Sequence, residues 1–169
     1  QTGEKLDSTT VGFIGAGNMA YSLIRGLLAR GTIASSIIAA DIDNEKLKFL
    51  SSECGVRTTD NQGVANEANI IVLAVKPQVM EGVCKNINLK TDSSLIVSVA
   101  AGITIGQLER WLGNDTAIIR CMPNTPALVG KGATGLYSNE IVSSTQKDLA
   151  KSLMDSVGIS VWVNNEIDI

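Results

Sequence analysis

Short apolar runs alternate along this chain with segments that repeat apolar residues every three or four positions. Val11–Ile14, Ile37–Ala40 and 69–75 are continuously apolar, as expected of parallel strands that are covered on both faces. Further strands are predicted at 56–58, 94–99, 116–121, 134–137 and 159–163. Helices are predicted at 21–30, 44–53, 62–67, 78–87, 105–112 and from 143 or 144 to 156.

This alternation of strands and helices predicts the fold class. It indicates one α/β domain built on a doubly wound, mostly parallel sheet of the Rossmann type, with right-handed crossovers. We assign residues 11–165 to this domain. Residues 1–10 are polar and lack an apolar period, so they are interpreted as a flexible leader.

Two details of the pattern are open to direct test. In the helix predicted at 78–87, Val79, Val83 and Ile87 recur every fourth residue and define its apolar face. The segment 122–126 is rich in proline, so it is expected to end the preceding strand and leave the sheet as a loop.

A glycine-rich motif follows the first strand directly. Residues 15–20, Gly-Ala-Gly-Asn-Met-Ala, fit the G-x-G-x-x-G/A fingerprint of dinucleotide-binding proteins. Gly15 permits the tight turn, Gly17 lets the backbone approach a pyrophosphate, and the small Ala20 lets the helix pack against the strand. The amides and dipole of the following helix would face the phosphates.

Asp41 supplies the acidic residue that completes this fingerprint. It ends the second strand about 20 residues beyond the glycines, where a carboxylate accepts hydrogen bonds from an adenosine ribose. An N-cap of the next helix is an alternative role for Asp41, and the two roles are compatible.

The carboxyl ends of the other strands are also small, polar or turn-forming segments. In a doubly wound sheet these ends surround the ligand crevice. Lys76 at the central strand end would contact a cofactor phosphate, a ribose or a substrate carboxylate, or is simply a solvated lysine. Asn124 and Thr125 offer polar groups to a nicotinamide or substrate, although both also suit an ordinary turn.

Composition narrows the possible chemistry. The chain has 169 residues, a net charge of −3 and no histidine, which excludes serine or cysteine nucleophiles paired with histidine and histidine-based metal sites. No metal is expected. Without a basic cluster or a long apolar run, neither nucleic acid nor a membrane is an expected partner, and a cytoplasmic location is predicted. Cys54, Cys84 and Cys121 are predicted to be reduced thiols, buried or half-buried.

Four ordered blocks of sequence carry a family resemblance. Residues 11–20 (VGFIGAGNMA), 73–78 (LAVKPQ), 98–104 (SVAAGIT) and 120–126 (RCMPNTP) together resemble the N-terminal domain of pyrroline-5-carboxylate reductase. The resemblance implies reduction of the cyclic imino acid 1-pyrroline-5-carboxylate to L-proline, the last step of proline biosynthesis, by NADPH or NADH.

The resemblance also implies roles for individual residues. Residues near the adenosine and pyrophosphate would be Gly15, Ala16, Gly17, Asn18, Met19, Ala20, Asp41 and Asn61. Those near the ribose and nicotinamide would be Ala74, Val75, Lys76, Pro77, Ala100, Ala101 and Gly102. Met122, Pro123 and Asn124 would border the reaction site.

Two departures from the family qualify these implications. Many relatives accept the extra phosphate of NADP near position 41, whereas the carboxylate of Asp41 would repel that phosphate. The choice between NADH and NADPH therefore stays open, with a preference for NADH. The family continues into a helical domain that forms the homo-oligomer and contacts the substrate, and residues 166–169 stand where that domain would begin. No catalytic residue is therefore expected within this chain, which we expect to be inactive alone.

Two other functions compete with this interpretation. One is a reductase resembling the β-hydroxyacid dehydrogenases, which place a catalytic lysine on their second domain. The other is a non-catalytic module that senses dinucleotides.

Overall fold

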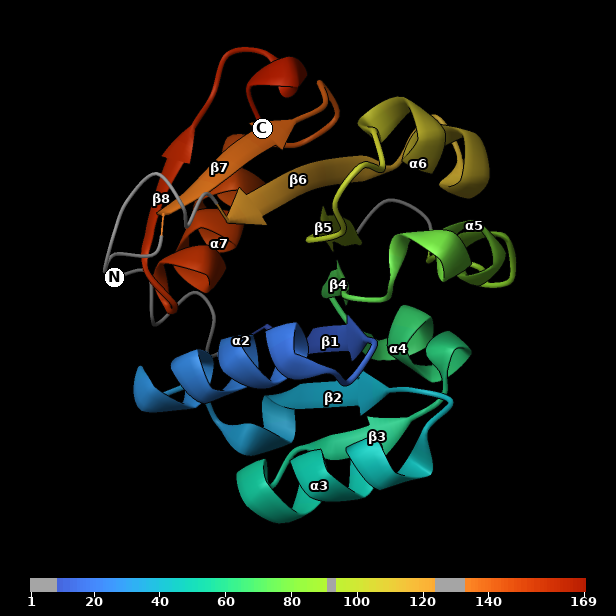
Figure 1. The fold of residues 1–169 in the computed structure, drawn as a ribbon, viewed down its shortest axis with the longest axis vertical. Coiled ribbons are helices and arrows are strands. Elements are labelled where there is room, and N and C mark those ends of the chain that lie inside the picture. The colour runs from blue at the N-terminus through green and yellow to red at the C-terminus, as the bar shows by residue number, and fades with distance from the viewer. Residues whose placement is uncertain (1–8, 91–93, 124–132) are drawn as a thin grey trace.

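The computed structural model describes residues 9–90, 94–123 and 133–169 of the chain. In these residues one eight-stranded sheet has the order β3-β2-β1-β4-β5-β6-β7-β8 (Figure 1). The strands are β1 (Val11–Ile14), β2 (Ile37–Ala40), β3 (Arg57–Thr59), β4 (Ile70–Leu73), β5 (Leu95–Ser98), β6 (Ala117–Pro123), β7 (Ala133–Ser138) and β8 (Ile159–Trp162).

The first six strands confirm the predicted doubly wound, mostly parallel sheet. Their order reverses between β1 and β4, and neighbouring strands from β3 through β6 pair in parallel. Beyond them, β7 is antiparallel to β6, and β8 runs parallel to β7. In such a sheet a ligand crevice is expected where the strand order reverses.

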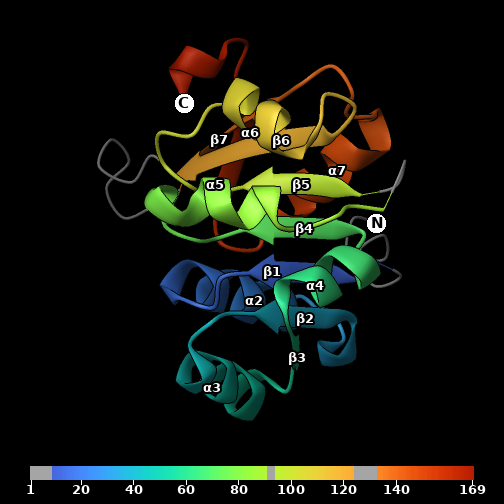
Figure 2. The ribbon, with the colours of Figure 1, turned by 90° about the vertical axis from the view of Figure 1, so that its right-hand side faces the viewer.

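Helices cover both faces of the sheet and bury its alternating residues in two cores. The helices are α2 (Asn18–Ala29), α3 (Asn44–Cys54), α4 (Asn61–Glu67), α5 (Pro77–Lys85), α6 (Ile105–Leu112) and α7 (Ser144–Asp155). One core joins α2, α3 and α7 to residues such as Phe13, and the other joins α4, α5 and α6 to residues such as Ile14 (Figure 2). Successive strand residues enter opposite cores, which explains why these strands are continuously apolar.

Most element boundaries lie within a few residues of the prediction, and two that differ are the start of α2 and the length of β4. Helix α2 begins at Asn18 rather than Tyr21, because Gly17 already has the extended backbone of an N-cap. The central strand β4 spans Ile70–Leu73 and is shorter than its apolar run.

The prediction that residues 122–126 leave the sheet at Met122 was wrong for the first two of them. Strand β6 continues through Met122 to Pro123, which pairs with Thr134 of β7. Strand β5 pairs with β6 only as far as Arg120, so Pro123 has a strand neighbour on one side, where a proline is tolerated. Residues 124–126 lie outside the described residues.

The N-terminal and C-terminal ends of the described chain both contact the sheet. Thr10, which the sequence analysis assigned to the leader, accepts backbone hydrogen bonds from Asn69 and Ile70 at 2.8 and 3.2 Å. A short 3-10 helix, η2 (Glu166–Asp168), follows β8. In β8, Ser160 is buried, while Ile159, Val161 and Trp162 are exposed.

Candidate functional site

A cavity of about 1100 Å³ opens at the carboxyl ends of β1, β2 and β4, where the strand order reverses. Its lining combines the turns that follow these strands with one side of α5. The lining residues are Ile14, Gly15, Ala16, Gly17, Asn18, Met19, Asp41, Ile42, Asp43, Lys46, Asn61, Ala74, Val75, Lys76, Gln78, Val79, Gly82, Val83 and Asn86. The structure thus brings together ten of the residues predicted to hold the cofactor.

The glycine turn has two positions that require glycine for different reasons. Gly15 has a φ of +106°, and a Cβ there would lie 2.5 Å from the carbonyl oxygen of Ala74. The turn therefore cannot carry a side chain at Gly15 without moving the backbone. At Gly17 a Cβ would meet no protein atom within 4 Å, so the space beside this backbone is open.

Two helices begin at the cavity without a side-chain cap. Gly17, which precedes α2, has no side chain, and Lys76, which precedes α5, has a side chain without an acceptor atom, so neither helix has a side-chain cap. In α5 the first helical residue is Pro77, which has no amide hydrogen to satisfy. Each of the other described α-helices is capped by a side-chain oxygen, from Asp43, Asp60, Thr104 or Ser143.

Asp41 is held by the backbone on both sides of the cavity rim. Its Oδ2 accepts a hydrogen bond from the amide of Ala16 at 2.7 Å, and its Oδ1 accepts one from the amide of Asp43 at 2.8 Å. The alternative role of Asp41 as N-cap of α3 was wrong, because the side chain of Asp43 caps that helix. A carboxylate has about four acceptor positions, so Asp41 keeps the capacity to accept ribose hydroxyls.

The charged lining of the cavity includes residues that the sequence analysis missed. Lys46 of α3 and Asp43 lie beside Asp41, and Lys76 lies at the end of β4. The side chains of Asp43, Lys46 and Lys76 are exposed. The position of Asp43 and Lys46 directly after the predicted strand end was the signal that could have identified them.

The predicted apolar face of α5 was right at Ile87, which is buried, and at Val83, which packs half-buried against the core, but it was wrong at Val79. Met80 and Cys84 are the helix residues that enter the core, with 0% and 1% exposure, while Val79 is 49% exposed and lines the cavity together with Val83. A second four-residue repeat, Met80 and Cys84 followed by Ile87, carried the correct signal. The structure therefore turns two valines of α5 toward the candidate site.

Several predicted site residues lie outside the cavity lining. Ala20 is fully buried against the sheet and Pro77 is exposed at the start of α5. Residues 100–102 form the turn between β5 and α6, in which Ala100 is buried and Gly102 has a φ of +76°. Met122 is half-buried in β6, Pro123 ends that strand, and Asn124 lies outside the described residues. The roles assigned to these residues stay predictions.

The three cysteines are free and buried, as the sequence predicts. Burial raises the pKa of the Cys84 thiol to about 11 and raises the pKa of the Cys121 thiol further. Neither thiol has the lowered pKa of a catalytic cysteine.

The described residues contain neither a metal-binding cluster nor a membrane-spanning helix. Within residues 9–90, 94–123 and 133–169, no three acidic, cysteine or histidine side chains are grouped closely enough to hold a metal ion. Over the same part of the chain, every helix is too short or too polar to cross a bilayer.

The geometry of the cavity fits a dinucleotide. An extended cofactor needs a track of small residues, open backbone amides for its phosphates and a volume near 1000 Å³. The turn at 15–17, the uncapped start of α2 and the volume of about 1100 Å³ meet these needs. Ala20 is 0% exposed, which agrees with the close packing of helix and strand that the fingerprint requires.

Comparisons with known proteins show that the chain is similar to oxidoreductases. Residues 10–102 match the model of the family described as NADP oxidoreductase, coenzyme F420-dependent. The chain is 44% identical to a pyrroline-5-carboxylate reductase of Pseudomonas aeruginosa over 167 residues, which cover 97% of this chain and 61% of the relative. A pyrroline-5-carboxylate reductase of Haemophilus influenzae is 40% identical, over 92% of this chain and 58% of the relative.

Solved structures give the same result. A pyrroline-5-carboxylate reductase from Coxiella burnetii superposes with a TM-score of 0.88 at 43% identity, covering 94% of this chain and 60% of the other. A pyrroline carboxylate reductase from Plasmodium falciparum with NADP bound has a TM-score of 0.80 at 29% identity, covering 94% and 59%. The chain thus spans about three fifths of the length of these relatives.

Proposed function

Because the chain belongs to the family described as NADP oxidoreductase, coenzyme F420-dependent, we propose that it is the dinucleotide-binding part of a pyrroline-5-carboxylate reductase. The whole enzyme would reduce 1-pyrroline-5-carboxylate to L-proline in proline biosynthesis. The reduced nicotinamide supplies a hydride to the imine carbon when the cofactor is bound. Relatives of this name at up to 44% identity support the assignment.

One observation carries the proposal: a large cavity lies where the strand order reverses, and the uncapped N-terminus of α2 borders it. Backbone amides at a helix start attract phosphate, and the helix dipole adds to that attraction. The open space beside Gly17 would let a pyrophosphate approach these amides directly. A chain that used this helix start only for stability would be expected to cap it, as it caps α6 and α7.

Each group of residues has a defined part in this proposal. Gly15–Ala20 would form the pyrophosphate turn, and Asp41 and Asn61 would lie near the adenosine. Residues 74–77 and 100–102 would position the ribose and nicotinamide, and residues 122–124 would border the substrate. The chain contains no histidine, so its contribution to the reaction is alignment and exclusion of water rather than proton transfer by histidine.

The choice between NADH and NADPH depends on charges at one end of the cavity. Asp41 and Asp43 would repel a 2′-phosphate, and Lys46 would attract one. Asp41 is fixed by two backbone amides, whereas Lys46 has an exposed, mobile side chain. We therefore expect NADH to bind more tightly than NADPH.

We place the proposed enzyme in the cytoplasm as a homo-oligomer. Three free cysteines suit a reducing compartment. The oligomer is implied by the family resemblance.

Reduction assays on a longer protein that includes this chain test the proposed function. NADH or NADPH consumption should be fastest with 1-pyrroline-5-carboxylate in a panel that also holds other cyclic imines, 2-keto acids and 3-oxo acids, the oxidised partners of β-hydroxyacids. Preference for a 3-oxo acid would favour the competing dehydrogenase function. Saturable cofactor binding without turnover of any of these compounds would favour a sensing module.

A further inference from the structure

Helix α6 receives a carboxylate from a distant part of the chain. The Oε2 atom of Glu166 in η2 accepts a hydrogen bond of 2.7 Å from the amide of Ile105, the first residue of α6. The same oxygen lies 2.9 Å from Nη1 of Arg120 in β6. Glu166 therefore joins η2 to α6 and β6, through residues that lie 61 and 46 positions earlier in the sequence.

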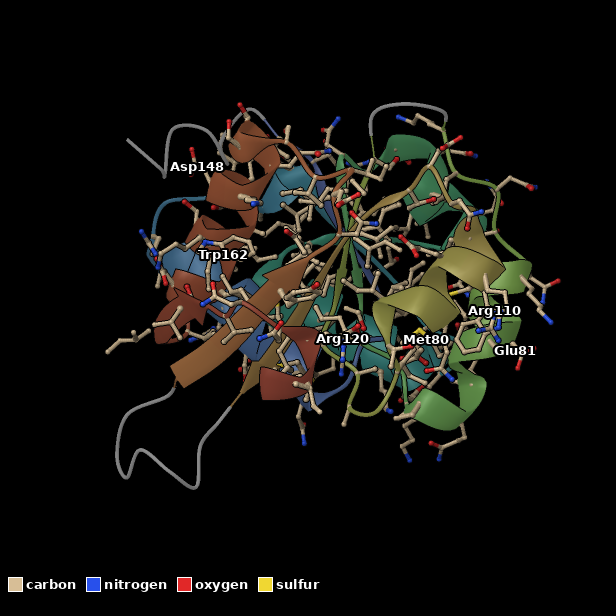
Figure 3. All side chains as sticks on the ribbon, turned by 90° about the horizontal axis from the view of Figure 1, so that it is seen from above. Met80, Glu81, Arg110, Arg120, Asp148 and Trp162 are labelled. Carbon is tan, nitrogen blue, oxygen red and sulfur yellow. The ribbon has the colours of Figure 1, made fainter. Side chains whose placement is uncertain are left out.

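Arg120 is a charged residue with a buried side chain, which is unusual in a sheet. Its side chain is 8% exposed, and the structure gives its buried Nε no hydrogen-bond partner. Arg120 lies toward the middle of the molecule, whereas Glu81 and Arg110 lie at its periphery (Figure 3). A buried guanidinium is costly unless a carboxylate offsets its charge, so Glu166 and Arg120 depend on each other.

The contact completes the N-terminus of α6. Thr104 and Gln107 form a capping box. The amide of Thr104 donates to Oε1 of Gln107 at 2.9 Å, and the amide of Gln107 donates to Oγ1 of Thr104 at 3.2 Å. The amide of Ile105 falls between them, and Glu166 satisfies it. A negative charge at this point is also favoured by the helix dipole.

The turn that these contacts hold is residues 100–104. Its start is fixed by the amide of Val99, which donates to the carbonyl of Leu73 at 3.2 Å, and by that of Ala100, which donates to Oγ of Ser98 at 3.3 Å. Its end is fixed by Thr104 and Glu166. Ala101 and Gly102 between these anchors are exposed.

We propose that Glu166, held by Arg120, is a positioning residue that sets the turn 100–104 against the nicotinamide half of the cofactor. The inference rests on the proposed function, because that function places residues 100–102 beside the nicotinamide. Glu166 acts through the turn and makes no contact with substrate. Loss of its carboxylate frees the start of α6 and lets the turn move away from the ring.

Binding of two probes to this chain separates positioning from general stability. NADPH and NADH contain the nicotinamide, whereas ADP-ribose ends before it. Glu166→Ala should weaken binding of the dinucleotides by roughly tenfold, about the equivalent of one net hydrogen bond, and leave the affinity for ADP-ribose unchanged. Glu166→Gln keeps an oxygen acceptor for Ile105 and should recover part of the loss. Hydrogen exchange at Ile105 should accelerate in the same order.

Glu140→Gln is the matched control, because Glu140 is an exposed carboxylate in the turn before α7. It should change neither affinity. Equal weakening of ADP-ribose and dinucleotides by Glu166→Ala would overturn the inference in favour of general destabilisation, as would unchanged dinucleotide binding with fast exchange at Ile105. Failure of the unmodified chain to bind either probe would instead overturn the proposed function and, with it, this inference.

Discussion

Helices α2 and α6 both follow a parallel strand at the same edge of the sheet, yet their N-termini are treated in opposite ways. Gly17 gives α2 no side-chain cap and leaves open space beside its backbone. Helix α6 has a capping box and a carboxylate from Glu166, 61 residues away. The first helix start is left available to a ligand, whereas the second is satisfied by the protein itself.

The same contrast separates the other helices. Helix α5 also begins without a side-chain cap and borders the cavity, while α3 and α7 are capped by Asp43 and Ser143. A helix N-terminus is stabilised by a suitable side-chain cap, so its omission at two neighbouring sites indicates a function. Substitutions at these helix starts and in their surroundings test this interpretation.

Gly17→Ser should have the largest effect, by giving α2 the type of cap that α7 has. The backbone of Gly17 is extended, which suits a serine N-cap. We expect the free energy of unfolding to stay constant or rise by roughly 0.3 kcal/mol. Affinity for NADH should fall by at least about thirtyfold, because the serine hydroxyl would accept a hydrogen bond from the helix amides and fill the open space beside them. Calorimetry and thermal unfolding measure the two effects.

Ser143→Ala is the reciprocal control at α7. Removing this cap should lower the free energy of unfolding by about 1 kcal/mol and leave cofactor affinity unchanged. If Gly17→Ser bound NADH as well as the original chain does, the functional interpretation of the uncapped helix would be wrong.

Asp41→Asn should change the choice of cofactor. The substitution removes a negative charge from the cavity rim while keeping one oxygen acceptor for the amides of Ala16 and Asp43. We expect the affinity for NADPH relative to NADH to rise about tenfold, or about 1.4 kcal/mol. Glu45→Gln removes a charge from the same helix region outside the cavity lining and should leave the ratio unchanged. An unchanged ratio in Asp41→Asn would exclude Asp41 as a determinant of specificity.

Lys46→Gln and Lys48→Gln form a matched pair on α3. Lys46 lines the cavity. Lys48 lies on the exposed helix surface, where its Nζ atom is 3.6 Å from Oε2 of Glu45. We expect Lys46→Gln to weaken NADPH binding about threefold and to reduce its dependence on salt, because an exposed lysine contributes a screened attraction. Titrations at two salt concentrations test this, and equal effects of both variants would refute a local role for Lys46.

The smallest effect concerns the thiol of Cys84, which lies on the side of α5 opposite the cavity valines. Burial raises its pKa from 9.0 to about 11, so the folded chain keeps this proton when the unfolded chain has lost it. The resulting contribution to stability is complete below pH 9 and is lost as the pH rises toward 11. The free energy of unfolding, measured from pH 8 to 11, should fall less steeply with pH in Cys84→Ala than in the original chain. Identical slopes would contradict the burial of this thiol.

The sequence predicted the strands, the glycine turn and the acidic residue at Asp41 because each is specified locally. A continuous apolar run indicates a strand covered on both faces, and glycine spacing indicates a particular turn. The fold class followed from these signals, and the fingerprint together with the family resemblance identified ten of the cavity-lining residues.

Features that depend on tertiary packing were missed. The face of α5 was wrong at Val79, because Val79 and Val83 recur at the same spacing as Met80 and Cys84 and only packing against the sheet decides between them. The continuation of β6 to Pro123 depends on pairing with β7. The contact of Glu166 with Ile105 joins residues 61 positions apart, which no local pattern reveals.

Calorimetric titration of this chain with NADH and with NADPH tests the central claim most directly. We expect saturable binding of one nucleotide per chain, with NADH bound more tightly than NADPH, and an accompanying rise in the unfolding temperature. Absence of binding heat and of any thermal shift with both nucleotides, in a chain shown by circular dichroism to be folded, would contradict the assignment of this cavity as a dinucleotide site.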